Sequence, residues 1–546
     1  MSSSRRRTLV VGHGGREAAL ATSMAESSVV HAVMGHANPT ITALVEAGGG
    51  SFTIGDVCDG PAIARFAVEH AVDLAMVSSD DPLAAGVVDE LRAAGVAAVG
   101  PTRAGAEIEW NKRFCRQVVA QVASEANPVF AVAETIDQVD RAIAEVADGG
   151  SPVVVKPVGL AGGKGVKVVG PHLADNAEAA RYAREVIGSG RHGGAVIIEE
   201  RITAPEVTIQ AMTDGRTVVF PPATYDYPYR FDGDTGPGTG GMGSCTMPGG
   251  LLPFVDRADY DQACAIVQAV IDYLADVGRP FSGCMNAGFF ATADGLRVIE
   301  CNARFGDPEG INIMGLLRGD WVSVMEAMVA RRLTAADVPL ADEASVVTYL
   351  VAPEYALGTS AGHRFTVDVE AARAVGAGVL FSSAVAVNPA SSAVSGTSGS
   401  PASSAVPGTS AVSSNSAVRS TCTGGAAHDG AATSTGVAVH EGAANYEGAG
   451  ASPRAATPGP AASARAATPG PGTYETVGTS RAVAITAVAS RIEDARATVA
   501  EAIAKSVTGD LQWRSDIGIV PGKAGSSGQP SNSRPTGGPV RRASSK

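Results

Sequence analysis

The chain of 546 residues is 45% hydrophobic and 18% charged, the composition of a globular protein with room for three or four domains. Its net charge of −13 and its pI near 5.2 argue against a nucleic-acid-binding surface spread over the whole molecule. No apolar run approaches the ~18 residues that span a bilayer, and the stretch after the first arginines is too short for a signal peptide. We therefore expect a cytoplasmic protein that binds neither membranes nor nucleic acid. The seven cysteines show no CxxC spacing, which favours reduced thiols over a zinc site.

Residues 1–105 alternate short apolar runs with helical stretches. We expect strands at 8–11, 29–34, 73–77 and 96–99, and helices at 16–24 and 82–94. This alternation predicts a small parallel α/β domain. The turn after the first strand, GHGGRE at 12–17, would direct backbone N–H groups at an anion, although such turns also serve only tight strand–helix packing.

Residues 106–330 mix strands and helices. The strand candidates are 152–157, 165–170, 195–200, 206–213, 216–220, 286–292 and 296–302. Between them, residues 231–244 (FDGDTGPGTGGMGS) are too glycine-rich for regular structure. We expect a mobile loop there, either an active-site flap or a long connection.

Residues 388–472 contain no Leu, Ile, Phe, Met or Trp and include near-repeats such as SSAVSGTS and SSAVPGTS. Such a segment cannot bury enough apolar surface to offset its ordering entropy, so we expect a disordered insertion. It would join strands at 378–387 and 481–488 within one domain, formed by 331–387 and 473–522. A helix at 492–506 would complete that domain, and 523–546 would be a flexible, mildly basic tail.

Two segments carry candidate chemistry. Residues 300–309 (ECNARFGDPE) place an acid and an amide, Glu300 and Asn302, two positions apart on a predicted strand, so that both face one side. A carboxylate beside an amide oxygen suits Mg²⁺ held against phosphate oxygens. Residues 156–169 (KPVGLAGGKGVKVV) form a strand that opens into a glycine loop carrying lysines. Together the two segments predict a nucleoside-triphosphate site.

With these motifs in order along the chain, the sequence resembles the phosphoribosylamine–glycine ligases, which are members of the ATP-grasp superfamily. The resemblance covers most of the chain outside the insertion and the tail. The matching stretches are VVGHGGREAALA (10–21), VVKPVGLAGGKGVKV (154–168), EERITAPEVTIQAMTDG (199–215), DGDTGPGTGGMGS (232–244), VIECNARFGDPE (298–309) and WRSDIG (513–518).

The resemblance implies a multidomain fold of α/β and α+β parts. An N-terminal Rossmann-like parallel sheet would occupy 1–105 and a central ATP-grasp domain of two α+β subdomains 106–330. A small C-terminal α/β ligase domain would follow. The family also implies a monomer with two small-molecule substrates, glycine and 5-phosphoribosylamine.

The resemblance implies residues for the nucleotide and its metal. Lys112 and Lys156 would contact the phosphates, beneath a loop at 162–165. The strand end at 199–202 would hold adenine, and Glu206 the ribose. The ATP-binding set is Lys112, Lys156, Gly162, Gly163, Lys164, Gly165, Glu199, Glu200, Ile202 and Glu206, and the ligands of Mg²⁺ or Mn²⁺ are Glu300 and Asn302.

The implied reaction has two steps. The glycine carboxylate attacks the γ-phosphate of ATP, and the amine of phosphoribosylamine then attacks the resulting glycyl phosphate. Besides Lys156, the candidate catalytic residues are Arg304, for the transferring phosphate, and Asp307, for the amino substrate; alternatively these two are a pair that fixes a turn. A loop at 240–243 would close over the reacting groups. The substrate-binding candidates are Gly14, Gly15, Arg16, Asp80, Asp226, Gly241, Met242 and Gly243.

Four stretches depart from the family pattern. PVGLAGGKG (157–165) has Val158 where an Asp is common. SSDDPL (78–83) stands where GPEAPL is usual, so that Asp80 would replace a glutamate near phosphoribosylamine. YDYPYR (225–230) stands for QDHKR, and PEYALG (353–358) replaces a GGYP-like turn. Two other readings therefore remain: an ATP-grasp ligase for a different carboxylate and amine, and a non-catalytic regulatory protein that binds a nucleotide.

Overall fold

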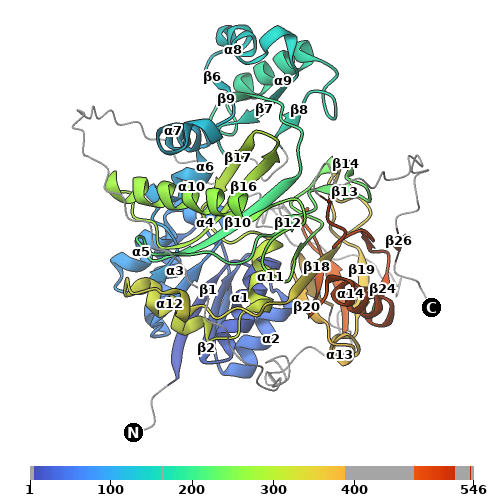
Figure 1. The fold of residues 1–546 in the computed structure, drawn as a ribbon. Helices are drawn as coiled ribbons and strands as arrows, with labels where there is room; N and C mark the ends of the chain where they lie inside the picture. The colour runs from blue at the N-terminus through green and yellow to red at the C-terminus, as the bar shows by residue number, and fades with distance from the viewer. Residues whose placement is uncertain (1–4, 161–164, 388–471, 523–540, 543–546) are drawn as a thin grey trace, which may run out of the picture.

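The computed structural model describes residues 5–160, 165–387, 472–522 and 541–542. The predicted insertion, apart from Gly472, and the predicted tail, apart from 541–542, lie outside the described residues. Figure 1 shows the N-terminal sheet at one end of the molecule, a smaller sheet with two helices at the other, and the C-terminal strands along one side.

The N-terminal part is a five-stranded parallel sheet in the order β3-β2-β1-β4-β5, which confirms the predicted α/β fold. Its strands are β1 (Arg6–Val11), β2 (Ser28–Met34), β3 (Phe52–Ile54), β4 (Leu74–Val77) and β5 (Ala97–Val99). Its helices are α1 (Gly15–Ala25), α2 (Pro39–Gly48), α3 (Gly60–Glu69), α4 (Asp80–Ala85) and α5 (Val87–Ala93). The single helix predicted at 82–94 is therefore two helices, separated by Gly86 with a φ of 85°. Because β1 and β4 are parallel neighbours, the loops at their carboxyl ends lie together.

The central part holds two antiparallel sheets. The first, in the order β6-β9-β7-β8, packs its apolar side chains against two helices. It consists of β6 (Phe130–Ala133), β7 (Val153–Pro157), β8 (Lys167–Val168), β9 (Val196–Glu200), α8 (Val139–Val146) and α9 (Asn176–Ser189). The second has the order β11-β10-β16-β17: β10 (Glu206–Thr213), β11 (Val218–Val219), β16 (Gly283–Thr292) and β17 (Gly295–Asn302), with the helices α6 (Arg103–Trp110), α7 (Lys112–Val122) and α10 (Arg257–Asp276).

The C-terminal part also holds two sheets. One has the order β12-β15-β18-β23-β20 and includes strands from both sides of the predicted domain boundary at 330: β12 (Tyr225–Asp226), β15 (Gly243–Thr246), β18 (Ala344–Leu350), β20 (Gly378–Phe381) and β23 (Val483–Ala489). The other has the order β21-β22-β19-β24: β19 (Arg364–Val367), β21 (Ala384–Ala386), β22 (Gly472–Thr476) and β24 (Val507–Gly509). The helices are α11 (Glu309–Leu316), α12 (Trp321–Val329), α13 (Val369–Ala374) and α14 (Ile492–Ser506), and β25 (Gln512–Trp513) pairs with β26 (Arg541–Arg542). Four 3₁₀ turns lie at Ser124–Ala126, Ile136–Gln138, Asp148–Gly150 and Ala335–Asp337.

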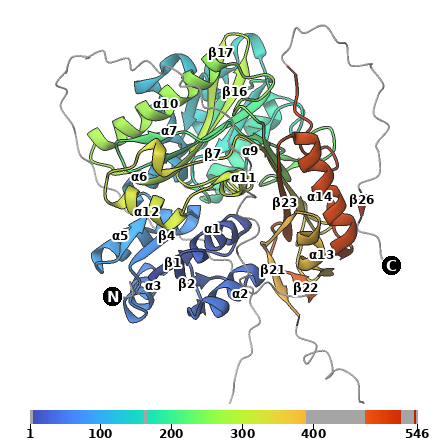
Figure 2. The ribbon, with the colours of Figure 1, turned by 60° about the horizontal axis from the view of Figure 1, so that its bottom comes forward.

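The N-terminal and C-terminal parts contact each other directly, and Figure 2 shows α2 beside β21. The side chain of Asn38 donates to the carbonyl of Phe381 over 2.8 Å, and Thr40 Oγ1 accepts from the Phe381 N–H over 3.0 Å. These bonds fix the loop after β20 against the start of α2.

The glycine-rich segment at 231–244 is more regular than its composition predicts, and its mobility stays a prediction. β13 (Tyr229–Phe231) and β14 (Thr235–Gly238) form a short hairpin, and the segment then enters the buried strand β15. The turn of the hairpin is tied down, because Asp516 accepts from the Gly233 N–H over 2.9 Å and Asp232 accepts from the Ser515 N–H over 2.9 Å. Polar contacts distant in sequence thus order a segment that has few side chains of its own.

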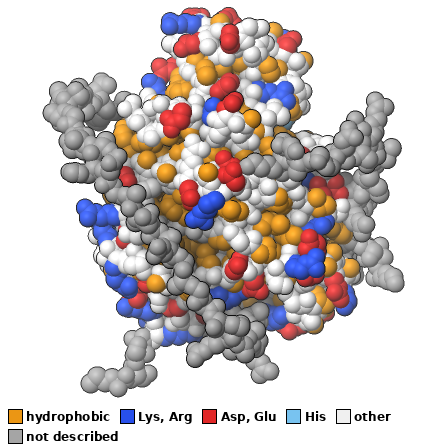
Figure 3. All heavy atoms as spheres, in the orientation of Figure 1, with side chains coloured by type: hydrophobic (Ala, Val, Ile, Leu, Met, Phe, Trp, Pro, Cys, Tyr) orange, Lys and Arg blue, Asp and Glu red, His pale blue; other side chains and the backbone are white. Residues whose placement is uncertain are grey.

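None of the helices in the described ranges is both long and apolar enough to cross a membrane. Six cysteines lie in those ranges and all are free thiols, as the spacing predicts. On the face that Figure 3 shows, acidic and basic side chains are interspersed with one another.

Removing the insertion should leave the fold intact. β21 and β22, which flank it, are paired antiparallel, with Ala384 opposite Thr476 and Ala386 opposite Tyr474. Replacing 388–471 by a two-residue Asn-Gly turn should therefore keep the hairpin. Shortening the loop from 84 residues to two spans about five doublings of its length, which favours the shortened chain by about 3 kcal/mol of loop-closure free energy. We therefore expect a melting temperature at least as high as that of the full chain and an unchanged rate of ADP release. A large loss of either quantity would contradict this prediction.

Candidate functional site

The predicted nucleotide residues Lys156 and Glu199 lie on the neighbouring strands β7 and β9. Lys156 Nζ lies 2.8 Å from Glu199 Oε2, and Arg116 of α7 lies 2.7 Å from Glu199 Oε1. All three side chains are buried. Burial alone would raise the pKa of Glu199, but the two cations outweigh it and lower the pKa to about 2. Glu199 is therefore ionised, and its charge is shared between two cations.

Lys112, Glu300 and Asn302 line the same narrow cleft as this ion-paired group. Asn302 Nδ2 lies 3.1 Å from Glu300 Oε1, so the acid and the amide do share one face of β17. Burial opposes ionisation of Glu300, but Lys112 and Lys156 outweigh it and hold the pKa of Glu300 below its usual value. The cleft is lined by three cations, Lys112, Arg116 and Lys156, and by three carboxylates, Glu109, Glu199 and Glu300, so its formal charges balance.

The cleft offers few ligands of its own to a metal ion. In the parts of the chain that the structure describes, no group of three or more His, Cys, Asp or Glu residues is placed to hold one. Glu300 and Asn302 supply a carboxylate and an amide oxygen, which are hard donors. Such a pair fits a Mg²⁺-like ion that takes its remaining ligands from water and phosphate oxygens.

Glu206, the first residue of β10, lies near the Glu300 carboxylate. Burial and, next, the Glu300 carboxylate raise the pKa of Glu206, Lys156 lowers it, and the net pKa is about 7. The side chain is thus on the edge of ionisation at neutral pH. Either form has an acceptor oxygen for its predicted role towards the ribose hydroxyls, and the ionised form offers two.

The pH dependence of stability should reveal this shifted group. An unfolded glutamate releases its proton near pH 4.3, whereas folded Glu206 keeps it until about pH 7. Between these values the folded state binds the extra proton, so its contribution to stability falls as the pH rises through that window. In nucleotide-free protein, Glu206→Gln should therefore weaken the loss of urea resistance between pH 5 and pH 7.5. Glu145→Gln, on the exposed face of α8, is the control and should leave that loss unchanged.

The structure describes only some of the remaining nucleotide-binding candidates. Gly162, Gly163 and Lys164 lie outside the described residues, and the Gly165 carbonyl accepts from the Tyr182 hydroxyl over 2.7 Å. Glu200 accepts from the Val129 N–H over 2.8 Å, at the edge of β6. Ile202 is half-buried just beyond β9. Their contacts with adenine stay a prediction.

The substrate candidates gather around the turn at 305–308, between β17 and α11. Arg16 Nη1 donates to the Phe305 carbonyl over 2.9 Å. A Cβ on Gly14 would lie 3.6 Å from Asp307 Oδ2, and one on Gly15 only 2.0 Å from the Tyr349 hydroxyl oxygen. The loop after β1 is therefore packed directly against the turn, and Gly15 is needed for that close approach.

Asp80 also belongs to this group. It begins α4, at the carboxyl end of β4, close enough to Arg16 and Glu109 to shift the pKa of each upward. Burial is the largest influence on both groups: it lowers the pKa of Arg16 and raises the pKa of Glu109. The net pKa of Glu109 is about 7. The departure at 78–83 therefore still places a carboxylate at the candidate site.

Arg304 and Asp307 do not pair with each other, which contradicts the alternative prediction that they form a pair that fixes a turn. Arg304 lies 3.1 Å from Glu109 and donates to Asn302 Oδ1 over 3.2 Å. Asp307 pairs instead with Arg481 over 2.9 Å. Arg304 is thus attached to the metal-binding candidates, and Asp307 to the C-terminal part of the chain.

The segment at 240–243 borders the turn on its other side. Gly241 has a φ of 97°, and a Cβ there would lie 2.6 Å from Pro308 and 2.8 Å from Asp226 Oδ1. Met242 is fully buried, and Gly243 pairs with Thr348 in the sheet. In this structure these residues form a packed wall beside the turn, and their closure over the reacting groups stays a prediction.

Several residues around the turn were missed by reasoning from the sequence. They include the buried side chains of Glu109, Arg116, Tyr349 and Arg481. Arg481 had a usable signal, because it is a lone charge at the start of an apolar strand. Its partner Asp307, however, lies 174 positions away in the chain. No local pattern reports such a contact.

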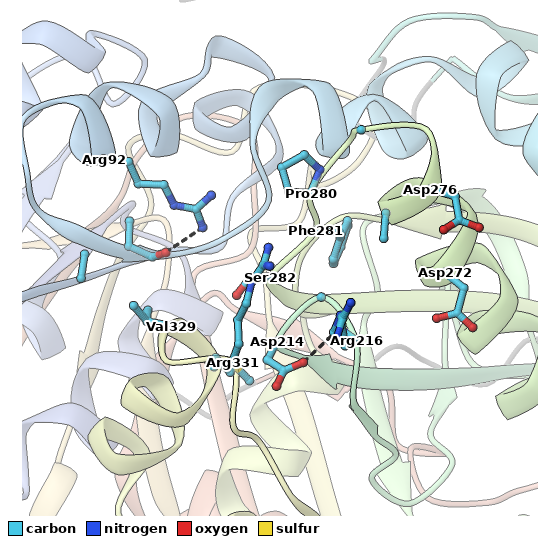
Figure 4. Close-up of a pocket in the computed structure, with 16 residues that line it drawn as sticks. Arg92, Asp214, Arg216, Asp272, Asp276, Pro280, Phe281, Ser282, Val329 and Arg331 are labelled. Atoms are coloured by element: carbon cyan, nitrogen blue, oxygen red, sulfur yellow. Dashed lines mark hydrogen bonds between the residues drawn. The ribbon is translucent and has the colours of Figure 1, made fainter.

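A larger cleft of about 990 Å³ lies elsewhere, between α5, the β10–β11 turn and the ends of α10 and α12 (Figure 4). Its charged lining is balanced: Arg92, Arg216, Arg331, Asp214, Asp272 and Asp276. Arg92 already donates to the carbonyls of Ala98 and Gly100. None of the predicted site residues lines this cleft, so the turn at 305–308 and the lysine-lined cleft remain the candidate site.

Two family models match consecutive parts of the chain. Residues 6–109 match the family model of the phosphoribosylglycinamide synthetase N domain, and residues 110–310 match that of its ATP-grasp (A) domain. The phosphoribosylamine–glycine ligase of Methanobrevibacter smithii is 41% identical over 376 residues, 69% of this chain and 84% of the relative. That of Thermococcus kodakarensis is 38% identical over 377 residues, 69% of this chain and 85% of the relative.

The fold agrees as well. A crystal structure of the phosphoribosylamine–glycine ligase from Thermotoga maritima superposes with a TM-score of 0.65 at 18% identity, covering 94% of this chain and all of that one. A biotin carboxylase from Campylobacter jejuni superposes with a TM-score of 0.50 at 15% identity, over 66% and 79% of the two chains. By these matches, the chain belongs to the phosphoribosylglycinamide synthetase family, that of the phosphoribosylamine–glycine ligases.

Proposed function

We propose that the protein ligates glycine to 5-phosphoribosylamine with ATP, forming glycinamide ribonucleotide, ADP and phosphate. The observation that carries this proposal is the meeting of two sets of residues at the end of β17. Lys112, Lys156, Glu199 and Asn302 line one cleft together with Glu300, and the loop after β1 and the segment at 240–241 pack beside the turn at 305–308. A reacting group bound at the turn would thus lie next to the phosphates.

In the first step, an oxygen of the glycine carboxylate attacks the γ-phosphorus of ATP, and ADP leaves. Lys112 and Lys156 would neutralise the phosphate oxygens, and Arg304 would orient the phosphoryl group. A divalent cation held by Glu300 and Asn302, Mg²⁺ or Mn²⁺, would supply Lewis-acid polarisation of those oxygens.

In the second step, the amine of phosphoribosylamine attacks the carbonyl carbon of glycyl phosphate, phosphate leaves, and the nitrogen loses a proton. Asp307 would orient this amine, and Asp226 would contribute to the same pocket. Three buried polar atoms near the turn support binding of polar substrates, because they lack hydrogen-bond partners among the described residues. They are Gln210 Nε2, Asp226 Oδ1 and Asn286 Oδ1.

The buried surroundings also protect the acyl phosphate from water. Phe305 is fully buried, and Met242 closes the wall behind Gly241. The protein would act as a cytoplasmic monomer on these small molecules.

A coupled ADP-release assay tests the function. Phosphoribosylamine is generated in situ from ribose 5-phosphate and ammonia, and each component is omitted in turn. We expect steady ADP release only when glycine, the amine, ATP and a divalent cation are all present. ADP release that ignores glycine would contradict the proposal and favour a ligase for another carboxylate. ATP binding without turnover under any condition would favour the regulatory alternative.

A further inference from the structure

Arg481 reaches the candidate site from the C-terminal part of the chain, two residues before β23. It is 7% exposed, and its Nη1 donates to the carbonyls of Gly241 over 3.1 Å and Asp307 over 2.8 Å, and also to that of Gly240. Its Nη2 lies 2.9 Å from Asp307 Oδ2. One guanidinium thus joins the wall at 240–241 to the turn at 305–308.

Tyr349, on the neighbouring strand β18, completes the arrangement. Its hydroxyl donates to Asp307 Oδ1 over 2.6 Å, and the Arg481 guanidinium lies 4.4 Å from the centre of its ring. Burial, and next the Asp307 carboxylate, raise the pKa of Tyr349 well above its ordinary value, so the hydroxyl stays a donor. Side chains therefore hold both oxygens of Asp307: Tyr349 of β18 holds Oδ1, and Arg481, just before β23, holds Oδ2.

The backbone around this pair is also fixed. The Tyr349 N–H donates to the Met242 carbonyl over 2.9 Å, and Gly15 packs against the Tyr349 hydroxyl. Asp307 consequently stands where the N-terminal loop, the central turn and the C-terminal sheet meet. A planar guanidinium that bonds a carboxylate and three carbonyls at once fixes orientation as well as distance.

We propose that Arg481 is a positioning residue for the ligation: it holds the carboxylate of Asp307 and the wall at 240–241 in register with the nucleotide cleft. Through this contact the C-terminal part of the chain sets the geometry of the amine-binding side. The inference rests on the proposed function, because it takes Asp307 as the group that orients the amine. The hydrogen bonds and the ion pair of Arg481 do not involve Lys112, Lys156 or Glu300, so we expect nucleotide binding not to depend on it.

We expect Arg481→Ala to impair the use of the amine without weakening the binding of ATP. Arg481→Ala should raise the KM for phosphoribosylamine and lower kcat, with a loss in kcat/KM on the order of 10²-fold, because misplacing a reacting group by about 1 Å has an effect of that size. The dissociation constant for ATP, measured by calorimetry, should change less than about twofold. A purely structural arginine would weaken all ligands together or none.

Chemical rescue makes the test specific. Guanidinium ion at low millimolar concentration should restore part of the activity of Arg481→Ala, whereas Arg481→Lys should stay impaired because an ammonium cannot bond carboxylate and carbonyls in one plane. Arg364→Ala is the matched control, because Arg364 forms an exposed pair with Glu475 in the same part of the chain. That variant should keep full activity and gain nothing from guanidinium.

The possible results distinguish a failure of the inference from a failure of the proposed function. If the unaltered chain shows no glycine-dependent ADP release, the function fails. If it does, but a folded Arg481→Ala keeps a normal kcat and KM for the amine, the inference is wrong. Should Arg481→Ala fail to fold, Tyr349→Phe decides: it removes one bond to Asp307 and should raise the KM for the amine alone. A normal KM in that variant would overturn the inference.

Discussion

Glu300→Gln should slow ADP release on the order of 10³-fold while the protein stays folded. The substitution keeps the shape of the side chain and removes the negative charge that faces Lys112 and Lys156. An amide oxygen binds a divalent cation more weakly than a carboxylate, and loss of about 4 kcal/mol of transition-state stabilisation corresponds to that factor. The measurement is the rate of ADP release at saturating ATP, with circular dichroism as the check on folding.

The control for this variant lies on the same hairpin. Asp294 is exposed at the turn between β16 and β17, so Asp294→Asn changes the net charge by the same amount away from the cleft. It should keep its activity. A Mg²⁺ titration should show that Glu300→Gln requires much higher metal concentrations. Near-normal turnover of that variant at ordinary Mg²⁺ would remove the metal assignment.

Arg116→Met should be the most destabilising single change at the site. Arg116 is 2% exposed and donates to both oxygens of Glu199 and to the carbonyls of Val298 and Ile299. Its removal leaves a buried carboxylate with Lys156 as its remaining cation and takes one donor each from the Val298 and Ile299 carbonyls, the second of which still accepts from Lys156 over 3.4 Å. Breaking a buried ion pair in this way costs about 3–5 kcal/mol. Urea denaturation of the purified variant measures the loss.

Arg113 on the same helix supplies the comparison. It pairs with Glu134 at the surface, where both side chains are about half exposed, and such pairs contribute about 0–1 kcal/mol. Arg113→Met should therefore change stability far less than Arg116→Met. Equal effects of the two substitutions would mean that the buried pair contributes little to the fold.

Regular elements with a clear hydrophobic period could be predicted from the sequence. The parallel N-terminal strands are buried runs of Val, Leu, Ala and Met, and α14 follows its predicted bounds. β3 was missed because it has three residues and two of them are exposed. β14 was missed because its glycines carry no side-chain pattern, and its order comes from contacts with residues 514–516, nearly three hundred positions away.

The residues of the candidate site also differ in whether a local sequence pattern predicts them. Glu300 and Asn302 could be paired from the sequence, because the two-residue period of a strand fixes their common face. Glu109 and Arg481 could not be assigned to it, because each meets its partner only after separate parts of the chain have packed together. Nothing in the residues around them indicates that partner.

The pairing of β21 with β22 has a consequence for how the protein can be built. A chain interrupted between them would yield two polypeptides, 1–387 and 472–546, that still share the β18–β23 ladder over seven residue pairs. We expect these fragments to associate when they are co-expressed. The shorter one would then deliver Arg481 to a partner that lacks it, and recovered ligation would report their assembly.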